Sequence, residues 1–109
     1  SDSPGDRGEE LAIKGLGLSV AVLDEKARAK YKLKDTTKGV LITNVDADGA
    51  AAEKGLKPGD VIVEISQEEV TNPADVKKKV DEARERNRKS VLLLVEGQGG
   101  LRFVALQIG

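Results

Sequence analysis

Apolar residues along this chain gather in short runs separated by polar and glycine-containing segments. Runs of four to eight β-branched or aliphatic residues, or runs in which apolar and polar residues alternate, are typical of β-strands. Alternation is clearest in the first run, where Leu18, Val20 and Val22 are separated by Ser19 and Ala21. We predict strands over residues 16–23, 40–45, 61–65, 91–95 and 101–108, with Val70 on a further short extended piece.

Two short helices are predicted between the first three strands. Asp24 is a suitable N-cap for a helix that ends near Tyr31, because its carboxylate can accept a bond from an amide of the first turn. Asp48 is expected to cap a second helix over residues 49–54 in the same way, and Gly55 is the expected residue just after its end.

A longer helix is predicted over residues 73–86. Asn72 is a favourable N-cap, and Pro73 suits the first helical position because no partner is needed for its missing amide hydrogen. Spacings of four and three then give one narrow apolar stripe, formed by Val76, Val80 and Ala83.

Turn residues separate these elements and complete an α+β pattern. Pro58 and Gly59 in Lys57–Asp60 predict a type II turn, and Gly97–Gly100 predicts a hairpin tip between the last two strands. Residues 11–109 are expected to form one domain, a partly open β-barrel of about five to six strands with two to three helices. The polar, acidic residues 1–10 are interpreted as a flexible tail or linker.

Composition excludes several functional classes. The 109 residues carry a net charge of −1 and contain no histidine and no cysteine. A Ser-His-Asp triad, a Cys-His dyad, a Cys/His zinc site and a disulfide are therefore impossible within this chain, and neither a cofactor nor a metal is expected. The balanced charge argues against nucleic acid as a partner, and no apolar run is long enough to insert into a membrane.

Two segments resemble the PDZ domain, in the form attached to Do-like (HtrA-type) bacterial periplasmic serine proteases. Ala50–Ile62, reading AAAEKGLKPGDVI, is similar to the family's signature of a small-residue helix followed by a Pro-Gly-Asp turn. Leu16-Gly17-Leu18 matches the apolar-Gly-apolar pattern of the family's carboxylate-binding loop. The helix after the first strand is similar to the second, C-terminal PDZ domain of these proteases. The resemblance implies the bacterial strand order, in which the groove strand comes first and the closing strand last.

The resemblance also implies a peptide-binding site. Gly17 would let the amides of about Gly17, Leu18 and Ser19 point into one concavity that suits a carboxylate. The predicted site residues are Lys14, Leu16, Gly17, Leu18, Ser19, Val20, Val76 and Val80. Two questions stay open at this point: whether Gly17 is merely a structural glycine at a strand entry, and which of the two valines faces the groove.

The function that follows is peptide recognition without catalysis. A peptide or unfolded segment would add as a strand beside residues 18–22, in a regulatory module of a periplasmic serine endopeptidase concerned with protein quality control. The isolated domain is expected to be monomeric. An alternative interpretation is a module that docks neighbouring protease subunits, with a groove that is weak or occupied internally; only two valines offer an apolar wall.

Overall fold

A computed structural model of the chain describes residues 10–13, 15–34, 36–97 and 99–108. Within these ranges it forms seven strands and three helices, in the order β1, β2, α1, β3, α2, β4, β5, α3, β6, β7. Residues 1–9 of the predicted tail and Lys14 of the predicted site lie outside the described residues.

The strands form one antiparallel sheet with two separate ends. Its order is β1-β2-β3-β4-β6-β7, and β5 pairs with β4 alone. The strands are β1 (Leu11–Ile13), β2 (Leu18–Val22), β3 (Val40–Val45), β4 (Val61–Ile65), β5 (Glu68–Glu69), β6 (Ser90–Gly97) and β7 (Gly100–Gln107). The predicted α+β class and the partly open barrel are confirmed, with β1 and β5 as strands beyond those predicted. Strand β2, the predicted groove strand, follows β1 near the start of the order, and β7 forms the far end of the sheet.

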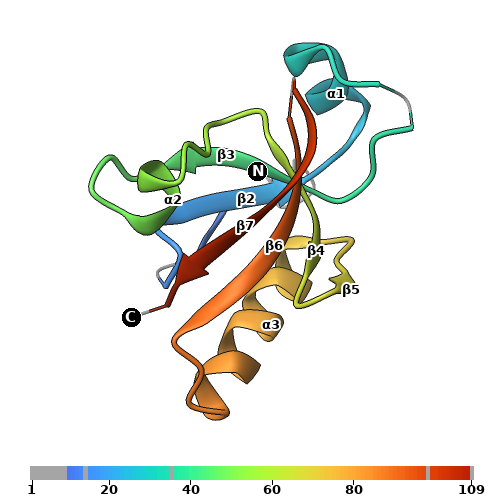
Figure 1. Cartoon of the computed structure of the whole chain (residues 1–109). Helices are drawn as coiled ribbons and strands as arrows, with labels where there is room; N and C mark the ends of the chain where they lie inside the picture. The colour runs from blue at the N-terminus through green and yellow to red at the C-terminus, as the bar shows by residue number, and fades with distance from the viewer. Residues whose placement is uncertain (1–9, 14, 35, 98, 109) are drawn as a thin grey trace.

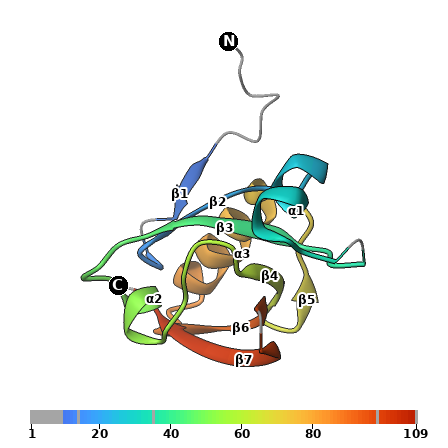
Figure 2. The same ribbon diagram turned by 90° about the horizontal axis from the view of Figure 1, so that it is seen from above.

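The sheet curves around the longest helix. The helices are α1 (Glu25–Tyr31), α2 (Ala50–Glu53) and α3 (Pro73–Glu85). Figures 1 and 2 show α3 beneath the curved sheet, where it lies against β1, β2 and β6. The main core fills this space. The first half of β3 is buried on both faces, because Val40 and Ile42 join the main core while Leu41 packs in a smaller cluster on the other face.

The helix boundaries follow from local capping. The Asp24 carboxylate accepts a bond from the amide of Ala27 at 2.8 Å, and the Asn72 side chain accepts one from the amide of Asp75 at 2.9 Å, as predicted. The prediction that Asp48 caps α2 is wrong. Gly49 holds that N-cap position without any side-chain hydrogen bond.

Helix α2 ends in the way that its sequence predicts. Gly55 adopts a φ of +83°, and its amide donates to the carbonyl of Ala52 at 3.0 Å. The amide of Leu56 donates to the carbonyl of Ala51, also at 3.0 Å. These two bonds form a Schellman motif, which satisfies carbonyls that the end of the helix leaves open.

The predicted Pro-Gly turn then aims the chain into β4. Gly59 has a φ of +99°, and the amide of Asp60 donates to the carbonyl of Lys57 at 3.1 Å. The buried Asp60 carboxylate accepts the Lys57 amide at 3.2 Å and lies 3.8 Å from the guanidinium of Arg102 on β7. The turn therefore joins α2, β4 and the closing strand.

Gly39, which directly precedes β3, lies where the sheet is tightly packed. It has a φ of +138°, and a β-carbon there would collide with the carbonyl oxygen of Ile62 and with the Val61 side chain. We expect Gly39→Ala to lower the free energy of unfolding by about 2–4 kcal/mol, because strain and collision add. Gly99→Ala is the matched control, since nothing lies within 4 Å of its added carbon and its φ is not positive. Urea denaturation measures both, and equal stability of the two variants would contradict the prediction.

Candidate functional site

The turn that enters β2 gathers backbone donors on one acceptor. Gly17 has a φ of +73°, a conformation that glycine adopts without steric cost. The amides of Leu16 and Gly17 both donate to the carbonyl oxygen of Ile13, at 3.0 and 3.1 Å. The amides that converge on one acceptor are therefore those of Leu16 and Gly17, and they begin one residue earlier than the predicted amides of Gly17, Leu18 and Ser19. Leu18 and Ser19 already belong to strand β2, opposite Val45 and Asn44 of β3.

Helix α2 and the loop before it hold this turn in place. The carbonyl of Gly17 accepts the amide of Asp46 at 2.9 Å, and the carbonyl of Leu16 accepts the amide of Ala51 at 3.2 Å. Gly17 and Gly49 touch, since a β-carbon on Gly17 would lie 2.9 Å from the α-carbon of Gly49. Two glycines are needed here because the two backbones approach more closely than side chains allow.

The apolar residues of the predicted site all lie in the main core. Leu16, Leu18, Val20, Val76 and Val80 are each at most 3% exposed and belong to one buried cluster. Helix α3 brings both of its valines into this cluster, while Ser19 is half-buried on β2. The structure thus gathers the apolar members of the predicted set in one buried cluster. Their role in binding a peptide stays a prediction.

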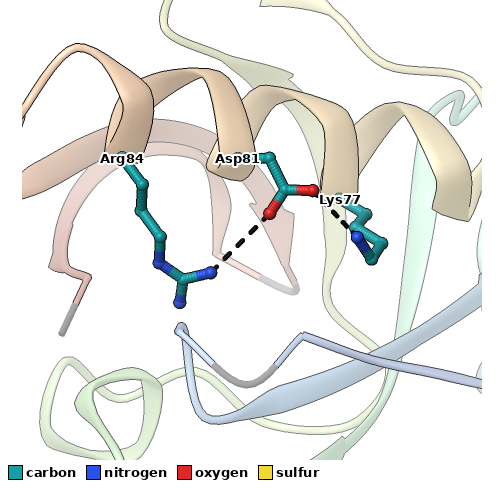
Figure 3. A network of polar contacts seen from close by, with 3 residues as sticks. All are labelled: Lys77, Asp81 and Arg84. Atoms are coloured by element: carbon teal, nitrogen blue, oxygen red, sulfur yellow. Dashed lines mark hydrogen bonds and ion pairs between the residues drawn. The ribbon is translucent and has the colours of Figure 1, made fainter.

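Sequence reasoning missed one charged residue beside the turn. The guanidinium of Arg84 lies over Gly15, so that a β-carbon on Gly15 would collide with it. Figure 3 shows Arg84 reaching from α3 toward the turn between β1 and β2. Arg84 follows Val76 and Val80 at intervals of four, so it shares their face of the helix. That spacing was the available signal, although the charge-rich helix suggested only a solvated surface.

Asp81 lies within ion-pair distance of Arg84, but the Arg84 side chain stays exposed. Its carboxylate lies 3.7 Å from the Arg84 guanidinium and 2.8 Å from the Lys77 ammonium, and all three side chains are more than 40% exposed. Exposed pairs of this kind contribute little to stability. Arg84 therefore keeps hydrogen-bonding capacity for another anion.

Further polar contacts fix the position of α3. Lys79 pairs with Glu68, which connects the helix to β5. This hydrogen bond lowers the pKa of the Glu68 carboxyl and raises the pKa of the Lys79 ammonium. At the start of the helix, the hydrogen bond from the backbone amide of Thr71 lowers the pKa of Asp75.

A shallow hollow of about 800 Å³ lies between α1 and the outer face of β2 and β3, lined by side chains such as Ala21, Tyr31 and Leu41. Within the described ranges, no three His, Cys, Asp or Glu residues are grouped so that they could hold a metal ion. None of the described helices has the length and apolar character needed to cross a membrane.

Comparison with protein families gives a match over residues 10–96, to the family described as "PDZ domain". Among curated proteins, the chain is 38% identical over 104 residues to a "Probable periplasmic serine endoprotease DegP-like" of Rhizobium meliloti (strain 1021), covering 95% of this chain. It is 35% identical over 108 residues, or 99% of this chain, to a protein of the same description from Brucella suis biovar 1 (strain 1330). The chain spans 18% of the length of each of these relatives.

Solved structures with the same fold include proteases and isolated domains. A structure described as "HtrA-type protease AlgW with decapeptide" matches with a TM-score of 0.72 and 29% identity, over 86% of this chain and 28% of that one. The "HtrA3 PDZ Domain Bound to a Phage-Derived Ligand (FGRWV)" matches with a TM-score of 0.61 over 93% of this chain and 84% of that one. At 14% identity, the second likeness concerns the fold alone.

The contact between the two glycines yields a prediction about the turn. Gly49 has a φ of −92°, which alanine tolerates, but an added β-carbon would lie 3.0 Å from the α-carbon of Gly17. We expect Gly49→Ala to move the amide resonances of Leu16 and Gly17 and to cost about 1–3 kcal/mol of stability.

Gly55→Ala is the matched control at the other end of α2. Its positive φ also costs about 1–2 kcal/mol, but nothing lies within 4 Å of the added carbon. Amide NMR spectra should therefore change around the turn in the Gly49 variant only. Unchanged resonances of Leu16 and Gly17 in that variant would contradict the close contact.

Proposed function

The chain belongs to the PDZ domain family, and from that membership we propose that it binds extended or C-terminal apolar peptide segments. In this proposal the peptide adds as a strand to the edge of β2 that faces α3. The observation that carries it is the combination of two convergent amides, an edge of β2 that is paired only in part, and an apolar helix face at one place.

Main-chain pairing supplies much of the affinity in such a complex. An edge strand presents amide and carbonyl groups that an incoming extended peptide can satisfy, and side chains at alternate positions of the peptide then enter the groove. The buried cluster around Leu18 and Val80 suits an aliphatic side chain. Affinity on the order of micromolar, about −8 kcal/mol, is expected, because ordering a flexible peptide offsets part of the contact energy.

Two features support recognition of a free C-terminus. The amides of Leu16 and Gly17 point at one acceptor, as a carboxylate oxygen requires. The guanidinium of Arg84 stands beside the same turn. Hydrogen bonds to a charged acceptor are roughly twice as strong as those to a neutral one.

The parent protein is proposed from its relatives. Similarity to DegP-like and HtrA-type proteases supports a periplasmic serine endopeptidase in which this chain is a regulatory module, corresponding to the second PDZ domain. This chain supplies no catalytic triad, because it contains no histidine. The structure of an HtrA-type protease with a decapeptide supports peptides or unfolded segments as partners.

An amide NMR titration tests peptide binding directly. We expect a peptide with an apolar C-terminal residue and a free carboxylate to shift resonances in Leu16–Val22 and Pro73–Val80 at micromolar to millimolar concentration. The same peptide with an amidated C-terminus should bind several-fold more weakly, because the charge-assisted bonds to the turn are lost.

The outcomes separate three mechanisms. Equal binding of both peptides would mean strand addition without recognition of the end. No shift with either peptide at millimolar concentration would refute the peptide-binding proposal. Docking of neighbouring subunits would then be the better account of this domain.

Arg84→Gln tests the electrostatic part of the proposal. We expect it to weaken binding of the free-acid peptide by about fivefold, or roughly 1 kcal/mol, the upper range for an exposed ion pair. Binding of the amidated peptide should not change. Arg86→Gln removes the same charge from a side chain near Glu68 and Lys79, and is expected to leave both affinities unaltered. Equal effects of the two substitutions would argue against a specific role for Arg84.

A further inference from the structure

The edge of β2 that a peptide would use already carries a strand from the same chain. Strand β1 pairs antiparallel with β2, with Leu11 opposite Val20, Ala12 opposite Ser19 and Ile13 opposite Leu18. Among the described residues the sheet has no strand beyond β1, and helix α3 lies alongside β1. Figure 2 shows β1 as the outermost strand beside β2. Strand β1 therefore stands where an added peptide would stand, in the same antiparallel direction.

The end of β1 also occupies the donors of the turn. The carbonyl oxygen of Ile13 accepts both convergent amides, those of Leu16 and Gly17. A peptide carboxylate bound at this turn would place an oxygen at that position. In the present structure a neutral backbone carbonyl takes that place.

The Ile13 side chain is buried in the way that the last side chain of a bound peptide would be. It is 3% exposed and belongs to the buried cluster that contains Leu18, Val76 and Val80. The neighbouring Ala12 is exposed, and Leu11 is half-buried against the same cluster. This alternation is the pattern of an extended peptide with one face in a groove.

We infer that Leu11–Ile13 is an internal ligand of this domain, and that an external peptide binds β2 only by displacing it. The inference rests on the proposed peptide-binding function and adds what fills the groove before a peptide arrives. An external ligand then binds with an affinity reduced by the fraction of molecules in which the groove is open. The segment also indicates the chemistry of a competing peptide: an aliphatic last residue, a small residue before it and an aliphatic third residue from the end.

The internal ligand is short, which makes displacement feasible. It covers three of the five residues of β2, so that Ala21 and Val22 have no partner in β1. Val22 is 44% exposed. A longer peptide can pair along the whole strand, and its free carboxylate makes stronger bonds to the turn than the neutral carbonyl of Ile13 does. An external peptide therefore has two advantages that offset the tethering of β1.

Displacement can be measured on the unmodified chain with one synthetic probe. The probe is an acetylated peptide with the sequence of residues 9–13, Glu-Glu-Leu-Ala-Ile, ending in a free carboxylate, added unlabelled to the ¹⁵N,¹³C-labelled 109-residue chain. At saturation we expect the nuclear Overhauser contacts between β1 and β2 to disappear while those between β2 and β3 remain. The amides of Leu11, Ala12 and Ile13 should move to random-coil shifts.

A substitution in the internal ligand provides a second readout. Ile13→Ala removes the side chain that anchors β1, so we expect this variant of the full chain to bind the probe at least tenfold more tightly. Leu41→Ala is the matched control, because Leu41 is equally buried but packs in the smaller cluster on the other face of the sheet. Its affinity for the probe should stay within twofold of the unmodified chain.

The results distinguish the two proposals. If the probe binds with the β1–β2 contacts intact, or binds the chain and the Ile13 variant equally, the internal ligand is refuted and the peptide-binding function stands. If the probe binds neither protein at millimolar concentration, both proposals fail. Should Ile13→Ala not fold, the displacement measurement on the unmodified chain decides alone.

Discussion

The edge of β2 opposite β3 is the constraint on which the rest of this structure depends. A strand edge presents amide and carbonyl groups that must find partners, and an uncovered edge pairs readily with any extended chain. Here β3 satisfies one edge of β2, and the short β1 satisfies part of the other. Helix α3 covers the space beneath them. The domain keeps one edge of β2 only partly paired, and that edge is where we propose that a peptide adds.

Glycines make this arrangement possible because they bring backbones together. Gly17 and Gly49 bring the turn before β2 against the start of α2. Gly59 lets the turn between α2 and β4 pack against the ring of Tyr31. The Pro-Gly turn after α2 therefore acts on the proposed site only indirectly. It links α2 to β4. Helix α2 and the loop before it hold the turn that enters β2 through the carbonyls of Leu16 and Gly17, and that turn presents two amides to a single acceptor.

Elements that carry several independent signals could be predicted from the sequence, and elements that carry few could not. The apolar run of β3 and the capping residues of α3 placed those elements correctly, since each carries several independent signals. Strand β1 has three residues, too few to show alternation, and its position depends on pairing with β2. Asp48 failed as a cap because the contact between Gly49 and Gly17 decides the geometry there. Arg84 is one of many charged residues in α3, and only the structure shows that its guanidinium lies beside the turn before β2.

The proposed role of β1 as an internal ligand changes how the measured affinity of this domain for a peptide is interpreted. A tethered segment competes at an effective concentration of about millimolar or more, whatever the concentration of other peptides around it. Ligands that merely equal the internal strand therefore remain largely unbound. Peptides that pair along all of β2 gain main-chain hydrogen bonds. Peptides that also present a carboxylate to the two amides and to Arg84 gain stronger, charge-assisted bonds. The internal strand is short and offers a neutral carbonyl to the turn, whereas the turn suits a longer peptide with a charged end. The domain therefore favours the free C-termini of peptides over internal segments of a peptide chain. This preference arises from the charge and the length of the ligand and not from the identity of its side chains.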